Sequence, residues 1–298
     1  MSTLTITTIQ TNLQWESKAV NLAMFEKKIF SIEERTELVV LPEMFSTGFS
    51  MNPEKLAENM DGETVQWMKR IAEEKNIILT GSLIIKDESS PSNLTLPPQE
   101  GERERGPGGE AFFNRLIWML PNGKYGTYDK RHLFAFAGEH EHYSSGAKRL
   151  IASVKGWKIN LQTCYDLRFP VWARQAPPLH LERGPGGEVG RGPEYDILIY
   201  VANWPERRSI AWKTLLAARA IENQCYVVGV NRVGNDGNNI YHSGDSMIVD
   251  PMGEVLYYMK DEEDVFTITL DKLHLDSVRE KYPFWKDADH FRISNDDE

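Results

Sequence analysis

The chain has 298 residues, 41% of them hydrophobic, and its 44 acidic and 34 basic side chains give a formal net charge of −10. This acidic balance argues against binding to nucleic acid or to an anionic membrane, because both need clustered Lys and Arg. Two cysteines are too few for a disulfide framework, and the N-terminal MSTLTITTIQ has neither the basic nor the apolar region of a secretion signal. We therefore expect a cytoplasmic protein.

The N-terminal third of the chain alternates strands with amphipathic helices. The expected strands are Leu4–Gln10, Glu37–Leu41 and Ile77–Lys86, and the expected helices are Ser17–Glu34 and Glu63–Lys75. Nearly unbroken apolar strands between such helices indicate an α/β sheet covered by helices. The stretch Ser46–Glu58 is loop-like and could form one wall of a cleft.

Two segments depart from this regular pattern. Ser89–Glu110 is rich in Pro, Gly and Glu without periodicity, and its ERGPGGE at Glu104–Glu110 recurs at Glu182–Glu188. This composition disfavours a packed core. We predict surface inserts at about 89–110 and 176–194 within one domain that spans residues 1–298, with a short motif for a partner as the alternative.

A hairpin with its turn at Pro121–Lys124 precedes Lys130. Its expected strands are Ala111–Leu120 and Lys124–Tyr128. The following HLFAFAGEHEHY carries His140 and His142 between acids, and one strand face could present both imidazoles to a metal ion. Further ligands at a recognisable spacing are missing, so we expect no metal.

Cys164 follows a short apolar strand in WKINLQTCYDLRFP, Trp157–Pro170, and precedes a polar turn. A nucleophile works best where a strand stops and the chain turns sharply, because the next backbone N–H can then face the same point. The alternative is a buried core cysteine, the commonest role of a lone Cys. Cys225 lies amid Tyr and Val in another expected strand, and we interpret it as core.

The C-terminal part of the chain predicts a βαβ crossover and therefore a parallel strand pair. The crossover comprises Asp196–Ala202, Ser209–Gln224 and Cys225–Val230, and it is followed by a hairpin of Met247–Val249 with Val255–Tyr258 and a last strand at Phe266–Leu270. The tail carries Tyr282, Phe284 and Trp285 on an otherwise polar chain, and it would expose apolar surface unless it packs on something.

Three distant segments together resemble the nitrilase superfamily of carbon–nitrogen hydrolases. They are TELVVLPEMF with Glu43, YGTYDKRHLF with Lys130, and CYDLRFP with Cys164. The resemblance continues in DILIYVANWP, AWKTLLAARAIENQ, YVVGVNRVG and HSGDSMIVDPMG, and covers nearly the whole chain apart from the two inserts. Within the superfamily, LPEMFSTGF, YDKRHLF and CYDLRFP are most similar to ω-amidases that act on 2-oxo acid amides.

The resemblance implies a fold and a set of catalytic roles. The fold would be a four-layer α-β-β-α sandwich with no metal or organic cofactor, and together with the aromatic tail it predicts a homodimer. Cys164 would be the nucleophile, Glu43 the base and Lys130 the cation at the oxyanion, with Glu139 supporting Lys130 and the Tyr165 N–H as second oxyanion donor. A free thiol of pKa ~8.5 is mostly protonated at neutral pH. We therefore expect this site to lower the pKa of Cys164.

The substrate end of the site has several candidates: Phe45, Phe49, Arg168, Trp204, Arg207 and Arg208. An Arg past a strand end could hold a carboxylate bidentately, although a surface Arg paired with an acid is the alternative. The expected partners are a small amide, such as 2-oxoglutaramate, and water, with hydrolysis through a Cys thioester. Other possibilities are a nitrilase, an N-carbamoyl amino acid hydrolase, or a non-catalytic binding protein of the same fold.

Overall fold

The computed structural model describes residues 2–87, 111–175, 193–289, 291 and 293. The insert predicted at 89–110 lies outside this part of the chain, and so does the one at 176–194 apart from Pro193 and Glu194. Among the described residues, no helix has the length and the apolar character that crossing a membrane requires.

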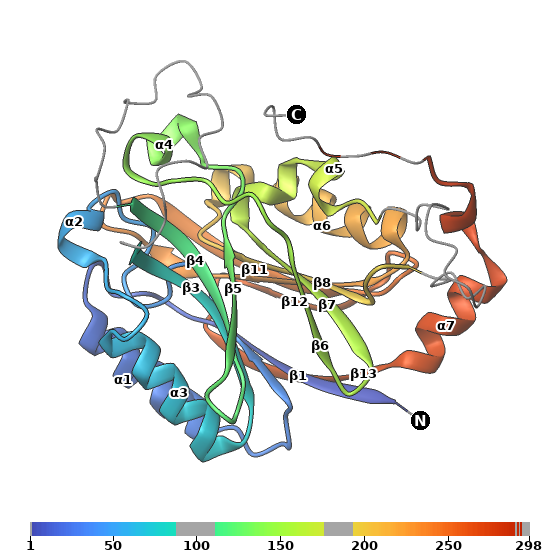
Figure 1. Ribbon diagram of the computed structural model, residues 1–298, viewed down its shortest axis with the longest axis horizontal. Helices are drawn as coiled ribbons and strands as arrows, with labels where there is room; N and C mark the ends of the chain where they lie inside the picture. The colour runs from blue at the N-terminus through green and yellow to red at the C-terminus, as the bar shows by residue number, and fades with distance from the viewer. Residues whose placement is uncertain (1, 88–110, 176–192, 290, 292, 294–298) are drawn as a thin grey trace, which may run out of the picture.

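Two β-sheets face each other in the middle of the molecule (Figure 1). The first has the strand order β13-β1-β2-β3-β4-β5, and the second has the order β10-β11-β9-β8-β7-β6, with β12 paired to β11. The strands are β1 (Thr3–Gln10), β2 (Leu38–Val40), β3 (Ile78–Asp87), β4 (Ala111–Met119), β5 (Tyr125–Asp129), β6 (Leu150–Val154), β7 (Trp157–Thr163), β8 (Ile197–Ala202), β9 (Tyr226–Asn231), β10 (Val233–Asn235), β11 (Tyr241–Val249), β12 (Val255–Lys260) and β13 (Asp264–Asp271).

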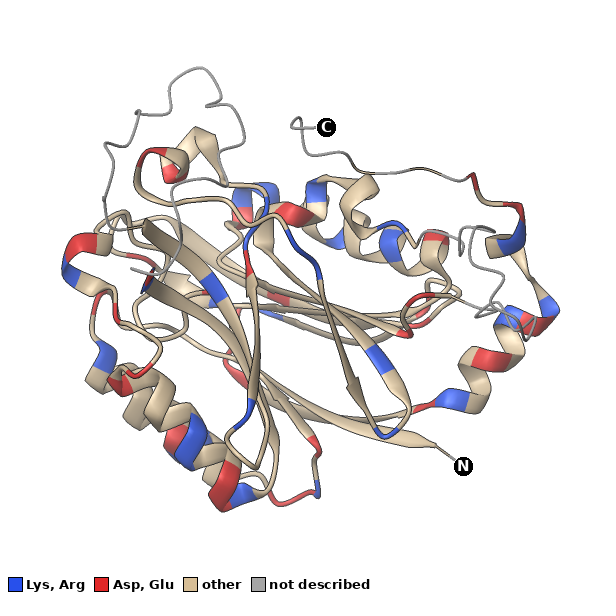
Figure 2. Ribbon diagram, in the orientation of Figure 1, with Lys and Arg blue, Asp and Glu red and all other residues tan. Residues whose placement is uncertain are grey.

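Helices cover the outer faces of both sheets. The α-helices are α1 (Lys18–Phe30), α2 (Pro53–Leu56), α3 (Glu63–Lys75), α4 (Glu139–His142), α5 (Pro170–Ala173), α6 (Ser209–Asn223) and α7 (Lys272–Lys281). The short 3-10 helices are η1 (Ala135–Ala137), η2 (Cys164–Arg168), η3 (Glu206–Arg208) and η4 (Phe284–Asp287). Charged side chains gather on these helices and on the connections, whereas the strands are mostly uncharged (Figure 2).

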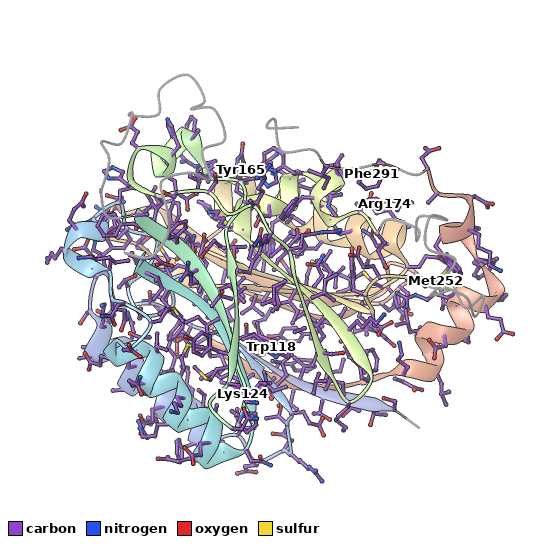
Figure 3. The ribbon with its side chains drawn as sticks, in the orientation of Figure 1. Trp118, Lys124, Tyr165, Arg174, Met252 and Phe291 are labelled. Atoms are coloured by element: carbon purple, nitrogen blue, oxygen red, sulfur yellow. The ribbon has the colours of Figure 1, made fainter. Side chains whose placement is uncertain are left out.

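Three apolar layers hold the sandwich together. One lies between α1, α3 and the first sheet, one lies between the two sheets, and one lies between the second sheet and α6. Trp118 of β4 belongs to the middle layer, whose side chains fill the space between the sheets (Figure 3). This arrangement confirms the predicted α-β-β-α sandwich.

The helices follow from the sequence periodicity. α3 buries Val65, Met68 and Ile71, which recur at the spacing of one helix face, and it ends where Asn76 adopts a left-handed conformation with φ of 51°. Its bounds match the prediction. α1 ends at Phe30, earlier than predicted, and the segment between β5 and β6 forms η1 and α4 rather than a strand. His140 and His142 therefore lie on a short helix.

Parallel strands deliver the polar residues of the site. β2 pairs in parallel with β1 and β3, and β7, β8 and β9 are mutually parallel, which confirms the predicted βαβ crossover. Carboxyl ends of parallel strands lie at the same edge of a sheet. Glu43 follows β2 in the first sheet, while Cys164 follows β7 and Asn203 follows β8 in the second.

Candidate active site

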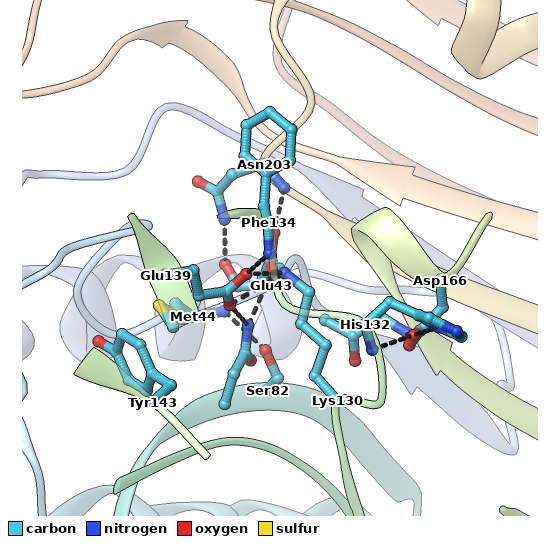
Figure 4. Close-up of polar contacts among 12 residues, drawn as sticks. Glu43, Met44, Ser82, Lys130, His132, Phe134, Glu139, Tyr143, Asp166 and Asn203 are labelled. Atoms are coloured by element: carbon cyan, nitrogen blue, oxygen red, sulfur yellow. Dashed lines mark hydrogen bonds and ion pairs between the residues drawn. The ribbon is translucent and has the colours of Figure 1, made fainter. Parts of the chain in front are cut away.

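Glu43 is fully buried, and hydrogen bonds hold both of its carboxylate oxygens (Figure 4). Oε1 accepts from Lys130 Nζ at 3.0 Å and from Asn114 Nδ2 at 2.8 Å. Oε2 accepts from the backbone N–H of Asn203 at 2.8 Å. Elements from both sheets therefore fix the orientation of this carboxylate.

Lys130 and Glu139 form a second buried ion pair beside Glu43. The Lys130 ammonium donates to Glu139 Oε1 at 3.0 Å and to Oε2 at 2.8 Å, and Oε2 also accepts the backbone N–H of Phe134 at 2.5 Å. Burial alone would lower the pKa of Lys130, but Glu139 and Glu43 outweigh it and raise this pKa. Burial raises the pKa of Glu139, and the Lys130 charge opposes that rise. Lys130 is therefore a permanent cation.

Cys164 stands at the end of β7 with φ of 47°, in the left-handed region, and is 8% exposed. Burial raises the pKa of its thiol, the negative charge of Glu43 raises it further, and Lys130 opposes both. The expectation of a lowered pKa is therefore wrong. Two carboxylates face the thiol together with one ammonium, so the thiol of the free protein is protonated and needs a base.

Asp166 connects the segment of Lys130 to the turn of Cys164. Its Oδ1 accepts the backbone N–H of His132 at 2.9 Å and lies 2.8 Å from His132 Nδ1. Its Oδ2 accepts the Tyr128 hydroxyl at 2.6 Å and the Thr163 backbone N–H at 3.0 Å. The fully buried Asp166 carboxylate thus holds the segment of Lys130 against the turn that carries Cys164.

The two phenylalanines expected near the substrate differ in position. The ring centroid of Phe49 lies 5.0 Å from Lys130 Nζ, so Phe49 adjoins the buried charges. Phe45 is fully buried against Phe25 and Trp67 in the layer between the first sheet and its helices. The interpretation of Phe45 as a pocket wall is therefore wrong, because its side chain fills the core.

The three arginines lie near one another at one side of the site, and two of them lie over aromatic rings. The guanidinium of Arg208 lies 4.8 Å from the Phe134 ring centroid, and that of Arg168 lies 5.2 Å from the buried Trp204. Arg207 is exposed and Arg208 is half-buried. Burial lowers the pKa of Arg208, and the neighbouring Arg207 charge lowers it further. Within the described ranges, no salt bridge joins any of the three to an acid.

Two further observations concern the cysteines and metal binding. Cys225 is fully buried just before β9, which agrees with its interpretation as core, and both cysteines are free. In the part of the chain that the structure describes, no cluster of three or more His, Cys, Asp or Glu could hold a metal ion.

Sequence reasoning missed four groups of this site: Asn114, Asn203, Asp166 and the Phe134 N–H. Asn114 had a signal, because it is a polar residue on the face of β4 that otherwise carries Leu116 and Trp118 into the middle layer. Asn203 directly follows a fully buried strand. The Phe134 N–H had no signal, since any residue type supplies that donor.

Comparison with known proteins shows the family of this chain. The family model described as carbon-nitrogen hydrolase matches residues 5–280. The chain belongs to the carbon–nitrogen hydrolase family. This member is a hydrolase that acts on carbon–nitrogen bonds, and its relatives include proteins named as amidases.

Relatives of this hydrolase match it over nearly their full length. It is 38% identical to the omega-amidase YafV of Escherichia coli K12, over 98% of this chain and 100% of that protein. It is 30% identical to the 2-oxoglutaramate amidase of Bacillus subtilis, over 95% and 96% of the two chains. A solved structure is also similar: XC1258 from Xanthomonas campestris, a CN-hydrolase superfamily protein with an arsenic adduct in its active site. It is 38% identical in sequence with a TM-score of 0.86, and the match covers 99% of this chain and 100% of that one.

Proposed function

We propose that this hydrolase cleaves the terminal amide of a small 2-oxo acid, such as 2-oxoglutaramate, to acid and ammonia through a thioester on Cys164. The observation that carries the proposal is the buried carboxylate of Glu43 beside a protonated thiol and the Lys130 ammonium. Similarity to proteins named omega-amidase and 2-oxoglutaramate amidase supports the substrate class.

The first step forms a carbon–sulfur bond. Glu43 takes the proton of the Cys164 thiol as the sulfur attacks the amide carbon, and the carbonyl π electrons move onto the oxygen. Lys130 and the Tyr165 N–H would stabilise this oxyanion. Tyr165 lies in the first turn of η2, where a backbone N–H has no acceptor within the helix. One such donor commonly contributes ~3 kcal/mol in the transition state.

The second half of the reaction returns the enzyme to its starting state. The protonated Glu43 gives its proton to the leaving nitrogen, the carbon–nitrogen bond breaks, and ammonia departs from the thioester. Glu43 then removes a proton from water, the resulting hydroxide attacks the thioester carbon, and the carbon–sulfur bond breaks. The thiolate takes back the proton from Glu43, so no external acid or base is consumed.

Lys130 needs a free N–H to serve the oxyanion. Its ammonium makes three contacts with carboxylate oxygens, two of them to the same Glu139 carboxylate. One N–H directed between both Glu139 oxygens serves these two contacts together, and this sharing leaves one N–H for the substrate.

The substrate carboxylate would bind at the arginines, of which we select Arg208. Arg208 is half-buried and lies over Phe134, whose backbone N–H donates to Glu139, whereas Arg207 and Arg168 are exposed. Glutamine carries an ammonium where the 2-oxo acid has a neutral carbonyl. Three neighbouring guanidinium groups would repel this charge, so the 2-oxo amide is the favoured substrate.

An ammonia-release assay with the purified protein tests the proposal. 2-Oxoglutaramate should be hydrolysed at least tenfold faster than glutamine or asparagine, and a plain nitrile hardly at all. A preference for nitriles would favour a nitrilase, and a preference for N-carbamoyl amino acids would favour the carbamoyl hydrolase. Absence of turnover on all of these substrates would favour a binding protein of the same fold.

We further propose a cytoplasmic homodimer in which the whole chain forms one domain and the two inserts are surface loops. The thiol chemistry suits a reducing compartment, since both cysteines are free. Phe284 in the tail and Ile210 on α6 are 62% and 80% exposed, as apolar residues of an interface would be in a single protomer. Sedimentation at micromolar concentration should give twice the monomer mass, and a monomer alone would contradict the homodimer.

A further inference from the structure

Asn114 bridges the two buried glutamates Glu43 and Glu139. Its side chain is fully buried, and Nδ2 donates to Glu43 Oε1 at 2.8 Å and to Glu139 Oε1 at 3.3 Å. The ammonium of Lys130 donates to the same two oxygens, each at 3.0 Å. Two nitrogen donors and two carboxylate oxygens therefore form a closed ring of hydrogen bonds.

The backbone of Asn114 is also hydrogen-bonded to Lys130. Its carbonyl oxygen accepts the Lys130 backbone N–H at 3.0 Å, which continues the pairing of β4 with β5. The neighbouring Arg115 points to the opposite face of β4, where Asp129 accepts from its Nε at 2.7 Å. The side chain of Asn114 is thus directed at the glutamates by strand geometry.

The charges explain why an amide occupies this position. Glu43 and Glu139 carry two negative charges that share one ammonium, and the repulsion between them favours protonation of one carboxyl group. The two N–H groups of an amide stabilise both carboxylates without adding charge. The opposite amide orientation would place a carbonyl oxygen against two carboxylate oxygens with no proton between them. The Oδ1 atom is buried without a hydrogen-bond partner, which is unfavourable. The same orientation directs Nδ2 at both glutamates.

We propose that Asn114 is a positioning residue that keeps the Glu43 carboxylate directed at the Cys164 thiol by bridging Glu43 and Glu139. The inference rests on the proposed role of Glu43 as the base. Because the Asn114 amide donates to the ionised form of two neighbouring carboxyl groups, its loss should move the acid limb of the pH–rate profile to higher pH.

The test replaces Asn114 by Leu, which keeps the approximate size but removes the donors. Two rates are measured against pH: ammonia release from 2-oxoglutaramate, and alkylation of Cys164 by iodoacetamide followed by mass spectrometry. For Asn114→Leu, we expect kcat to fall about tenfold to hundredfold, as for a lost hydrogen bond to a charged group. KM should stay within about threefold, since the amide does not touch substrate. The acid limb of both profiles should move to higher pH by about one unit or more.

Asn160→Leu is the matched control. Asn160 is also a fully buried strand asparagine, but both of its side-chain polar atoms lack partners, and it touches neither glutamate. It should keep the acid limb of the wild-type protein. If Asn114→Leu does not fold, Asn114→Asp serves instead, because it keeps the shape of the side chain. It sets a third carboxyl group against the two glutamates, which should also move the acid limb of the pH profile to higher pH.

Two results overturn the inference: a folded Asn114→Leu with an unmoved acid limb, or a folded Asn114→Asp with an unmoved acid limb. Failure of the proposed function has a different signature. Glu43→Gln would then retain turnover, whatever the Asn114 variants do. Alkylation of Cys164 reports the base even if the physiological amide differs from 2-oxoglutaramate, so the two failures are distinguishable.

Discussion

Asn203 donates its backbone N–H to Oε2 of Glu43 at 2.8 Å and its side-chain amide to the backbone oxygen of Glu43 at 2.5 Å. The two residues belong to connections from opposite sheets. A peptide N–H at a strand end has little freedom to move. The position of β8 relative to the first sheet therefore sets the orientation of the Glu43 carboxylate. The carboxylate that we propose as the base is therefore oriented before any substrate binds.

Replacement of Cys164 by Ala should abolish turnover, because the thiol is the proposed nucleophile, and should leave the fold intact, because the change removes only one sulfur atom from its core cluster. Cys225→Ala should keep turnover, at a stability cost of about 1 kcal/mol for a small buried group. Ammonia release and thermal unfolding of both variants check this prediction. Hydrolysis by Cys164→Ala above the uncatalysed rate would contradict it.

Glu43→Gln and Lys130→Met should each lower kcat/KM by orders of magnitude, because the residues act as one unit. Lys130→Met should also destabilise the protein by ~3–5 kcal/mol, since it leaves two buried carboxylates without their cation. Single-turnover kinetics and urea unfolding measure both effects. Lys124→Met, in the β4–β5 turn, is the surface control. A mild loss of activity at Glu43 or Lys130 would remove that residue from the site.

Arg208→Gln should raise KM for 2-oxoglutaramate by about 30-fold to about 5,000-fold, because loss of a desolvated ionic contact costs ~2–5 kcal/mol. Hydrolysis of an amide without a carboxylate, such as propionamide, should change little. Arg207→Gln is the matched control and should behave as the wild-type protein, since Arg207 is exposed. Equal effects of Arg208→Gln on both amides would show that Arg208 does not bind the carboxylate.

His242 should make the protein less stable in mild acid. Burial lowers its pKa from 6.5 to about 4, and the nearby Arg232 charge lowers it further. Between these values the unfolded chain binds a proton that the folded chain does not, so the stability is complete above pH 6.5 and falls as the pH drops toward 4. The loss amounts to ~3 kcal/mol. Urea unfolding of wild type and His242→Asn across this range should show a smaller loss in the variant, and parallel curves would refute the assignment.

Most of the fold could be predicted because local patterns and tertiary packing agree. The inner face of α3 recurs at helical spacing, and the apolar strands β8 and β9 flank a helix of the right length for a parallel crossover. The segment after β5 was not predictable in this way. There Gly138 adopts φ of 76° and precedes α4. Glu139, the first residue of α4, forms a buried ion pair with Lys130, and this tertiary contact determines the local conformation.

The residues that we propose as catalytic were chosen from strand-end positions and family resemblance, but their electrostatics could not be predicted in this way. The pKa of Cys164 depends on burial and on two carboxylates whose positions only the folded chain reveals. Phe45 shows the same limit, because its neighbours in sequence do not tell which face of the first sheet its ring occupies. Residue type indicates what a side chain can do, and the packing of its surroundings determines what it does.

The left-handed backbone of Cys164 restricts which other nucleophiles this position could evolve. A β-branched side chain is disfavoured at positive φ, so threonine, whose hydroxyl serves as a nucleophile in other hydrolases, would strain the turn after β7. Serine has no second branch and would fit. The positive φ at this position thus favours side chains without a β-branch. Among these, only cysteine combines a reactive sulfur with a proton that a carboxylate base can accept.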